Sequence, residues 1–326
     1  MTNLLRDKPD DFNALVSATA GAIRIDPAFV EKDYWVTEVL RAACADRVTR
    51  RADGTEATVS FVFKGGTSLS RVFAIIERFS EDVDMLAVFP ENCSESARHK
   101  VLKQVDADVV AATGVLSTPI RSTKGVKRDT SYPYVAQYGA LSLRDNGVLL
   151  ELGSRGGPHP ASKHVFSSLI AQHAINVLGD NENTWDEFSP FEVNVLAPER
   201  TLFEKLAAVH ATVLSSDITA IGRIGRHYYD IARLLGNESV LTSLKDLGPD
   251  GRAGLIDDIN SRSDAAGWDW QPRPNGGYAK SVAFDNQGPN WSSVNLAYTS
   301  ALELVHGDRP TLAQVLEAVR GSSELI

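Results

Sequence analysis

The sequence predicts an α+β fold, with a mixed, mostly antiparallel sheet that carries helices on one face, followed by a mainly helical C-terminal lobe. Short β-rich apolar segments alternate with helical periodicity up to residue 196, and the periodicity after that is helical. An Asn-Gly pair at residues 146–147 is typical of the tip of an antiparallel hairpin. We expect two domains, residues 1–197 and 198–326, because 326 residues suffice for two cores.

The N-terminal domain is expected to begin with a pair of helices within residues 11–45. Asp26 and Pro27 separate them, since proline fits the first turn of the second helix. The later elements are strands at residues 57–63, 83–89, 134–143, 148–152 and 191–196, a helix at 94–112, and a turn at 144–147 that joins the third and fourth strands as an antiparallel hairpin.

The C-terminal lobe is expected to start with a helix at Pro198. Thr201 and Glu204 have the spacing of a capping box, so Thr201 is predicted to cap this helix. A second helix is predicted at residues 218–235, from the spacing of its apolar side chains.

The last ninety residues carry weaker signals. Helical patterning recurs at residues 255–259 and 302–319, and Pro310 with Thr311 is expected to start the final helix. The aromatic, glycine-rich stretch at residues 268–291 has no clear period. We interpret it as a packed irregular loop, the alternative being a docking surface for bases or for a partner protein.

A Gly-Gly-Thr-Ser turn follows the first of the predicted strands. Gly65 and Gly66 lack a Cβ, so the backbone can turn sharply there and approach a polyphosphate closely. Thr67 and Ser68 open a helix expected over residues 69–77, whose free N–H groups and dipole favour an anion at its start. Glycine pairs before helices often serve only as turns, so this motif alone is weak.

An Asp-x-Asp pattern opens the next strand. Asp82 and Asp84 are two residues apart, so both carboxylates project from one face of the sheet. Two convergent carboxylates form the hard, oxygen-rich site that Mg²⁺ prefers, and we expect them to hold one or two ions. An acidic strand end can also serve solubility alone. The Gly-Gly turn and the Asp-x-Asp strand, in this order with one helix between them, predict a nucleotidyltransferase active site.

Glu151 is a lone acidic residue in the apolar strand predicted at residues 148–152, on the same face as Leu149. Burial without a partner would be costly, and a metal or another cation would supply the partner. The alternative is an exposed glutamate at a sheet edge, since edge strands often carry charge.

Composition excludes several classes of protein. Apolar residues make up 43% of the chain and charged residues 23%, as in ordinary globular proteins. The net charge of -9 argues against non-specific coating of nucleic acid. The two cysteines are too few for a disulfide framework or a zinc site. Without a signal-peptide core or a long apolar run, we expect a cytoplasmic protein and no membrane partner.

A short basic cluster is an exception to the acidic composition. It comprises Arg121, Lys124, Lys127 and Arg128, close to Tyr132 and Tyr134. A solvated loop is the ordinary interpretation of such a charge run. A loop that holds an RNA backbone is the alternative.

The two motifs resemble the AbiEii-type nucleotidyltransferase toxins, a family that includes the MenT toxins and belongs to the DNA polymerase β-like superfamily. The matching segments are Lys64-Gly-Gly-Thr-Ser-Leu69 and Arg78-Phe-Ser-Glu-Asp-Val-Asp84, with shorter matches at Glu31-Lys-Asp-Tyr-Trp-Val36, Glu204-Lys-Leu206 and Arg226-His-Tyr-Tyr-Asp230. The resemblance spans about residues 28–235 and implies a polymerase β-like core.

The resemblance also implies roles for particular residues. Lys64 joins Gly65, Gly66, Thr67 and Ser68 in the nucleotide-binding set. Lys205 binds the triphosphate, and Asp230 completes the site. Glu151 is the candidate for the third metal-binding carboxylate beside Asp82 and Asp84, and would help the acceptor hydroxyl to lose its proton. The alternative for Lys205 and Asp230 is a surface ion pair, which would contribute little to stability.

The family implies a toxin of a toxin–antitoxin or phage-defence pair that transfers a nucleoside monophosphate from an NTP to an acceptor hydroxyl, with Mg²⁺ as cofactor. Because MenT members add nucleotides to the tRNA 3′ end, we expect tRNA as acceptor, blocked translation as the effect, and a cognate antitoxin as partner. Two alternatives remain: a transferase acting on a small molecule or a protein, and a non-catalytic nucleotide- or RNA-binding protein. The intact carboxylate pair argues against the latter, because like charges are costly without a cation.

Overall fold

The computed structural model describes residues 3–80, 82–139 and 147–326, and this part of the chain forms a mixed sheet and twelve α-helices. The predicted α+β class is confirmed. The chain divides into two compact units. The sheet unit comprises Met1–Ser68, Ser80–Arg155 and Ala161–Val195, and the helical unit comprises Leu69–Phe79, Gly156–Pro160 and Leu196–Ile326.

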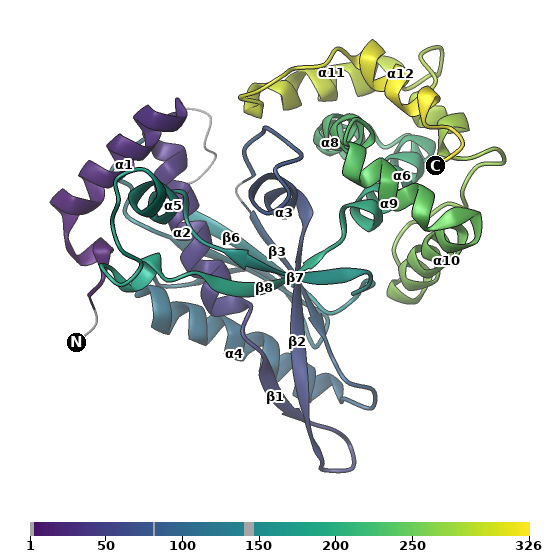
Figure 1. Ribbon diagram of the computed structural model, residues 1–326. Coiled ribbons are helices and arrows are strands. Elements are labelled where there is room, and N and C mark those ends of the chain that lie inside the picture. Colours follow the sequence, from purple (N-terminus) through teal and green to yellow (C-terminus); the bar gives the residue numbers. More distant parts are fainter. Residues whose placement is uncertain (1–2, 81, 140–146) are drawn as a thin grey trace. The chain divides into compact units, whose positions relative to one another are not determined.

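The sheet has the strand order β4-β5-β6-β3-β2-β8-β7, and β1 pairs with β2 beside this path (Figure 1). The strands are β1 (Arg47–Arg50), β2 (Glu56–Lys64), β3 (Asp82–Val88), β4 (Thr118–Thr123), β5 (Lys127–Pro133), β6 (Gly147–Gly153), β7 (Ala161–Phe166) and β8 (Phe191–Leu196). The β1–β2, β2–β3, β4–β5 and β5–β6 pairs are antiparallel, whereas β2–β8 and β3–β6 are parallel. The predicted mixed, mostly antiparallel sheet is therefore confirmed.

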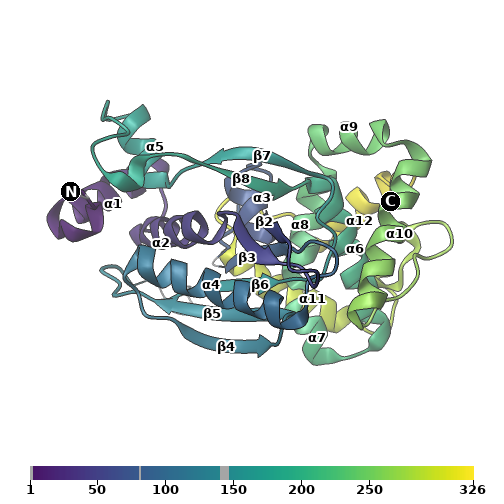
Figure 2. The same cartoon turned by 90° about the horizontal axis from the view of Figure 1, so that it is seen from below.

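Four helices belong to the sheet unit, and α3 leads out of it. They are α1 (Pro9–Ile23), α2 (Pro27–Ala43), α4 (Glu95–Thr113) and α5 (Leu169–Asn176), with α3 at Gly65–Arg71. Helix α4 runs alongside β5 and packs against α2 (Figure 2). The predicted boundary between α1 and α2 is confirmed, because Asp26 caps α2 by accepting a hydrogen bond from the N–H of Ala28 at 2.9 Å, and Pro27 occupies its first turn.

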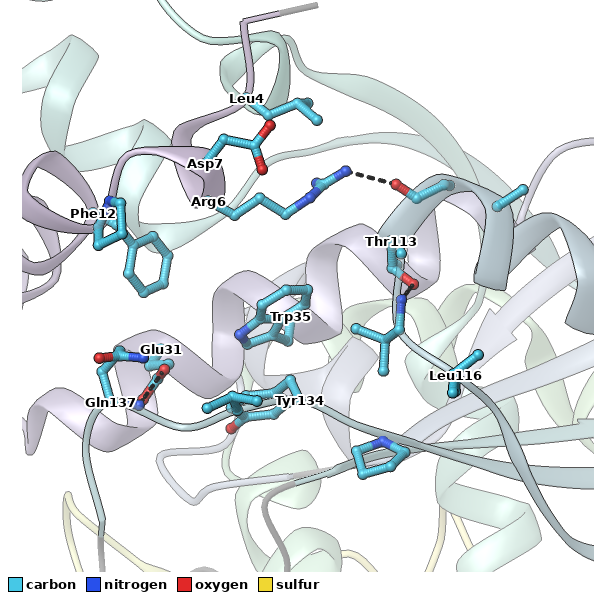
Figure 3. Close-up of a pocket in the computed structure, with 17 residues that line it drawn as sticks. Leu4, Arg6, Asp7, Phe12, Glu31, Trp35, Thr113, Leu116, Tyr134 and Gln137 are labelled. Atoms are coloured by element: carbon cyan, nitrogen blue, oxygen red, sulfur yellow. Dashed lines mark hydrogen bonds between the residues drawn. The ribbon is translucent and has the colours of Figure 1, made fainter.

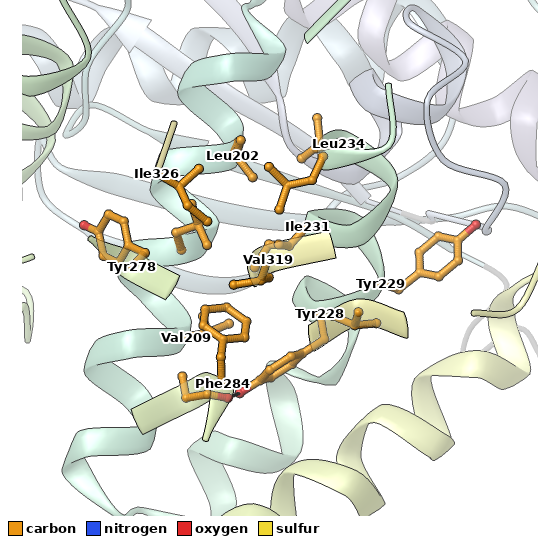
Figure 4. Close-up of a cluster of buried hydrophobic side chains, with 14 of the residues drawn as sticks. Leu202, Val209, Tyr228, Tyr229, Ile231, Leu234, Tyr278, Phe284, Val319 and Ile326 are labelled. Carbon is orange, nitrogen blue, oxygen red and sulfur yellow. Dashed lines mark hydrogen bonds between the residues drawn. The ribbon is translucent and has the colours of Figure 1, made fainter. Parts of the chain in front are cut away.

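The helical unit is built on one large apolar core. Its helices are α6 (Pro198–Ser215), α7 (Ile218–Arg223), α8 (Gly225–Leu235), α9 (Glu238–Asp246), α10 (Gly248–Ala266), α11 (Trp291–Ala301) and α12 (Leu312–Gly321). Val209 of α6, Ile231 of α8 and Val319 of α12 meet in this core (Figure 4). Tyr278 and Phe284, from the stretch between α10 and α11, are also buried there, so this part of the stretch is packed as predicted, whereas Trp268 at its start is 51% exposed.

The predicted strand at residues 134–143 is wrong. The antiparallel partner of β6 is β5, seven residues earlier in the chain, and residues 134–139 are not in a strand. Residues 140–143, with most of the predicted turn at 144–147, lie outside the described residues. Arg128 and Tyr132 of β5 reach Asp106 on α4, so one face of β5 is covered even though its sequence is strongly polar.

Two helix boundaries also differ from the prediction. Helix α3 starts at Gly65 and ends at Arg71, so it does not reach the predicted residue 77. Ala74 adopts a positive φ of 51°, and the chain folds back so that the N–H of Ile75 donates to the carbonyl of Leu69. Ile75 is then buried in the core of the helical unit, which a continued helix would not allow.

The predicted cap of α6 is wrong as well. Pro198 lies in the first turn and Ala197 is the N-cap, so Thr201 is already inside the helix and its hydroxyl donates to the carbonyl of Ala197 at 3.3 Å. The predicted helix at 218–235 is broken into α7 and α8. Gly225 begins α8 where a Cβ would lie 2.1 Å from the carbonyl oxygen of Ala297, so α11 approaches the backbone closely at this break. The predicted start of α12 is confirmed, since Thr311 forms a capping box.

Candidate active site

The Gly-Gly turn directly follows β2, forms the first residues of α3 and touches the Asp-x-Asp strand. Gly65 has a φ of +83°, and a Cβ at this position would lie 2.0 Å from Oδ2 of Asp84. Lys64, the last residue of β2, is paired with Asp84 in the antiparallel β2–β3 ladder. The missing side chain at residue 65 therefore lets the two halves of the sequence motif meet.

The hydroxyl groups of the turn are used to fix it in place. Oγ1 of Thr67 donates to the carbonyl of Asp82 at 2.6 Å, and Oγ of Ser68 donates to the carbonyl of Gly65 at 2.9 Å. Both side chains are buried. The groups of this turn best suited to an anion are therefore the backbone N–H groups at the start of α3, because the first N–H groups of a helix point out of its end.

One row of charged side chains crosses four neighbouring strands. In the register of the sheet, Lys64 is paired with Asp84, Asp84 with Glu151, and Glu151 with Asp129. Directly paired residues share one face of a sheet, and Asp82 lies on that face because it is two residues from Asp84. The backbone thus brings the three predicted metal-binding carboxylates, Asp82, Asp84 and Glu151, to one face. The edge position given in the alternative for Glu151 is wrong, because β6 lies between β5 and β3, although the side chain is 38% exposed.

A lysine supplies the cation that was predicted to accompany Glu151. Nζ of Lys127 lies 3.0 Å from Oδ2 of Asp129 and 3.8 Å from Oε2 of Glu151. Within the described residues, no three His, Cys, Asp or Glu side chains form a group arranged to hold a metal ion. The oxygen donors on the shared face suit Mg²⁺ chemically, but in this arrangement an ammonium group lies against two of the carboxylates of the row.

The segment at residues 31–36 is structural. Burial raises the pKa of Glu31, although its carboxylate accepts hydrogen bonds from the backbone N–H groups of residues 137–138, which act in the opposite direction. The ammonium of Lys32 donates to the carbonyl of Gly147, the first residue of β6. Helix α2 thereby holds the strand that carries Glu151, and this part of the sequence motif supports the site indirectly.

A second charged cluster lies within the helical unit. The Arg78 guanidinium binds Asp230 in a bidentate manner, with Nε 2.7 Å from Oδ1 and Nη2 2.8 Å from Oδ2. Nζ of Lys205 also lies 2.8 Å from Oδ2 of Asp230. All three side chains are buried: Arg78 is 3% exposed, Asp230 is 0% exposed and Lys205 is 9% exposed. Lys205 and Asp230 are thus brought together between α6 and α8 as predicted for an ion pair, but the pair is buried and not on the surface.

The charges of this cluster perturb its neighbours. Burial alone would raise the pKa of Asp230, but the Arg78 guanidinium and the Lys205 ammonium outweigh it, so the pKa of the carboxyl is far below its usual range. Burial, followed by the Lys205 ammonium, lowers the pKa of His227 to about 3, and its Nδ1 lies 3.5 Å from Nζ of Lys205. The cluster has two cationic side chains for one carboxylate, so it carries an excess positive charge.

Three residues of the basic cluster at 121–128 lie in strands, Arg121 in β4 and Lys127 and Arg128 in β5, and only Lys124 lies in the short turn between them. Lys124 pairs with Glu95 at 3.2 Å, and Arg128 pairs with Asp106. With Lys127 held by two carboxylates, most of this positive charge is compensated within the sheet unit. These ion pairs disfavour the interpretation of the segment as an RNA-binding loop.

The sheet unit also has a cavity of about 790 Å³ between α1, α2 and the C-terminal end of α4 (Figure 3). Trp35 stacks on Tyr134 in its wall, with ring centroids 5.2 Å apart, and Arg6 lies on the other side of Trp35. None of the predicted site residues is among those that line it. The cavity is therefore distinct from the carboxylate row.

The geometry defines a class of protein. A mixed sheet, in which a Gly-Gly turn contacts an Asp-x-Asp strand and a further carboxylate lies alongside, is the site of a nucleotidyltransferase. A family model described as "Nucleotidyl transferase AbiEii toxin, Type IV TA system" matches residues 52–249, more than half of the chain. The chain belongs to this family. It is a nucleotidyltransferase toxin of a type IV toxin–antitoxin system, and membership implies a nucleotide substrate and a cognate antitoxin.

Among solved structures, the chain is similar to MenT4, a nucleotidyltransferase toxin from Mycobacterium tuberculosis H37Rv. The two share 16% sequence identity with a TM-score of 0.39, over 96% of this chain and 98% of that chain. A search of curated proteins found no match. In the part of the chain that the structure describes, no helix has both the length and the apolar character needed to cross a membrane.

Three residues that matter to these clusters were not predicted as site residues. Arg78 was noted only as part of a motif, and its distance of 152 residues from Asp230 hides their pairing. Lys127 belongs to the basic cluster that the sequence analysis interprets as a loop, and Asp129 carries no role there. The signal that identifies them is alternation, because Lys127 and Asp129 share one face of β5 while Arg128 lies on the other.

Proposed function

We propose that this toxin transfers a nucleoside monophosphate from an NTP to the 3′ end of tRNA, in a reaction that depends on a divalent metal and releases pyrophosphate. The observation that carries the proposal is the contact of Gly65 with Asp84, in register with Glu151. This contact puts a turn suited to a polyphosphate against carboxylates suited to the metal that accompanies it.

Asp82, Asp84 and Glu151 are proposed to hold Mg²⁺. They supply hard oxygen donors from one face of β3 and β6, and the absence of a Cβ at Gly65 leaves room for the carboxylate of Asp84. The ion would neutralise the charge that develops on the phosphates during an in-line transfer. Glu151 would in addition help the acceptor hydroxyl to lose its proton.

The phosphates of the NTP are proposed to be bound by the turn and by Lys205. Lys64, Gly65, Gly66, Thr67 and Ser68 form the predicted set at the turn, and the buried hydroxyls leave this task to the backbone N–H groups. Lys205 keeps a net attraction for phosphate, because Arg78 already balances the charge of Asp230. Asp230 would then complete the site by holding Lys205 in position.

The acceptor is inferred from the family to which the chain belongs. The net charge of -9 and the compensated basic segment point to recognition of a defined RNA end and not to coating of an RNA backbone. Addition of nucleotides to tRNA would block aminoacylation and stop translation, and the antitoxin would counteract this effect.

The test is to incubate the purified protein with Mg²⁺, bulk tRNA and each α-labelled NTP separately. Asp82→Ala is the inactive variant, and Asp46→Ala, at an exposed position of the sheet unit, is the matched control. Label on tRNA with the wild type and with Asp46→Ala, but not with Asp82→Ala, is the expected result. Pyrophosphate release only with small-molecule or protein acceptors would overturn tRNA as the acceptor.

A further inference from the structure

The carboxylate row contains one more buried acid than the proposed metal site requires. Asp129 is 4% exposed and is paired in register with Glu151, which is itself paired with Asp84. Oδ1 of Asp129 is buried and has no hydrogen-bond partner among the described residues. A buried carboxylate oxygen without a partner is costly, so its position calls for an explanation.

Lys127 is the cation that faces Asp129 on its own strand, β5, and Glu151 on the neighbouring strand, β6. Its ammonium lies 3.0 Å from Asp129 and 3.8 Å from Glu151, and the side chain is only 32% exposed. One ammonium balances the charge of one carboxylate, whereas Lys127 faces two, Asp129 on β5 and Glu151 beside it on β6. This pair of carboxylates therefore keeps an excess negative charge that attracts a further cation.

If Glu151 holds a divalent ion, the ammonium of Lys127, 3.8 Å from the same carboxylate, repels that ion. Like charges a few ångströms apart near a protein surface repel each other, so the ammonium and the ion cannot both stay close to Glu151. Lys127 has a second carboxylate on its own strand, so it can give up Glu151 while keeping Asp129. The shorter of its two ion pairs is the one that it would keep.

We propose that Lys127 is a built-in counterion that competes with the divalent metal for Glu151, and that Asp129 is the residue that retains Lys127 when the metal binds. This inference rests on the proposed function, because it concerns the same metal. Neither residue touches the substrate in this scheme, so both are positioning residues that set the metal affinity and not catalytic residues.

The test is binding of Mn²⁺ to the full-length protein without nucleotide, measured from the electron paramagnetic resonance signal of free Mn²⁺. We expect Lys127→Met to bind Mn²⁺ about fivefold more tightly, and Asp129→Asn about fivefold more weakly, because one ion pair near the surface is worth about 1 kcal/mol. Lys124→Met is the control. It removes a lysine charge three residues from Lys127, where the ammonium pairs with the exposed Glu95, and this variant should bind Mn²⁺ as the wild type does.

The possible outcomes separate this inference from the proposed function. If the wild type binds Mn²⁺, Asp84→Asn does not, and Lys127→Met equals the wild type, the competition is overturned while the metal site stands. If the wild type binds no Mn²⁺, the proposed metal site and the inference both fail. An equal gain in Lys127→Met and Lys124→Met would overturn the inference in favour of a general effect of net charge.

A measurement on the wild type covers the case in which Lys127→Met does not fold. Acetylation of lysines by a water-soluble reagent, followed by mass spectrometry of the peptides, reports how strongly each ammonium is held. Metal should raise the acetylation rate of Lys127 several-fold, because the amine loses one of its two carboxylate partners, while Lys124 stays unchanged. An unchanged or lower rate at Lys127 in the presence of Mn²⁺ would contradict the competition.

Discussion

At the scale of single residues, the candidate site depends on one glycine. Gly65 has a positive φ, and its Cα hydrogen faces the carboxylate of Asp84. An alanine would add backbone strain and push a methyl group into the position of an Asp84 oxygen. We expect Gly65→Ala to lower the free energy of unfolding by about 2 kcal/mol and to abolish nucleotidyl transfer, measured by urea unfolding and by transfer of α-labelled NTP.

The matched control for this prediction is Gly54→Ala. Gly54 has nearly the same positive φ, +84°, but nothing lies within 4 Å of a Cβ built there. The control should therefore show the cost of the backbone conformation alone, about 1 kcal/mol, with transfer activity unchanged. If both variants lose activity equally, the contact with Asp84 is not what matters at residue 65.

Arg78 is the second residue whose role is testable in isolation. Its guanidinium provides two of the three ion-pair contacts of the buried Asp230. Arg78→Met would leave that carboxylate with Lys205 alone, and breaking a buried pair from one side costs about 3–5 kcal/mol. We expect a loss of this size in the free energy of unfolding, together with a raised KM for NTP because Lys205 would be drawn more tightly to Asp230.

The comparison for Arg78 is Arg233→Met. Arg233 pairs with Glu77 at 3.0 Å, one residue before Arg78, but both members of that pair are partly exposed. Loss of this ion pair in Arg233→Met should lower the free energy of unfolding by less than about 1 kcal/mol. A KM for NTP that stays constant in Arg78→Met, despite lower stability, would confine Arg78 to a purely structural role.

The sequence marks single residues most clearly where the motif is local. Gly65 and Asp84 are recognisable because a turn and an acidic strand follow each other within twenty residues. Asp230 was identified only through resemblance, and its guanidinium partner is 152 residues away, so no local pattern records the pair. The surface interpretation of the Lys205–Asp230 pair failed for the same reason, since burial depends on packing of the whole helical unit.

At the scale of secondary-structure elements, the α6–α8 pair makes stability depend on pH. The pKa of His227 on α8 is lowered to about 3 by burial and by Lys205 on α6, whereas an unfolded histidine has a pKa of about 6.5. Between these values the unfolded chain binds a proton that the folded chain does not. The folded state is therefore fully favoured above about pH 6.5 and loses stability as the pH falls toward 3.

We expect the free energy of unfolding to fall by about 1 kcal/mol between pH 6.5 and 5. This is about half of what the full pKa difference would give, because His227 is partly exposed to solvent. Urea unfolding at both pH values measures it in the wild type and in His227→Gln, which should lose about 1 kcal/mol less over this interval. His164→Gln, on β7, is the control and should behave as the wild type. A wild-type pH dependence that persists in His227→Gln would show that another group is responsible.

Element boundaries that the local sequence marks were predicted correctly, whereas those shaped by distant contacts were not. The helix predicted at 218–235 from its apolar spacing is broken into α7 and α8, where α11 approaches Gly225. The start of α2 at Asp26 and Pro27 and the N-cap of α12 at Thr311 can be recognised from the neighbouring residues alone. Strand β5 is so rich in charged and hydroxyl side chains that it has the composition of a loop, and its strand character comes from pairing with β4 and β6. Helix α3 ends early because Ile75 and Ile76 are drawn into the core of the helical unit.

At the scale of the whole molecule, the sequence predicted the class of protein more firmly than the details of its site. The α+β class and the family follow from motifs that lie close together in the chain. The complete carboxylate row was not predicted. Asp82, Asp84 and Glu151 were expected at one site, but the addition of Asp129 follows from the antiparallel pairing of β6 with β5, and the sequence predicted another partner strand for β6.

The last prediction concerns the effect of the whole protein on a cell. If transfer to tRNA is the toxic activity, induced expression in a bacterial host should stop protein synthesis before RNA synthesis, measured by pulse labelling with amino acid and with uridine. Asp84→Asn and Gly65→Ala should permit growth, whereas Lys124→Met should remain toxic, because its ion pair with Glu95 is exposed. Toxicity that survives in Asp84→Asn at equal protein levels would separate growth inhibition from nucleotidyl transfer. Arrest of RNA synthesis first would point instead to an acceptor other than tRNA, since a block of aminoacylation acts on translation directly.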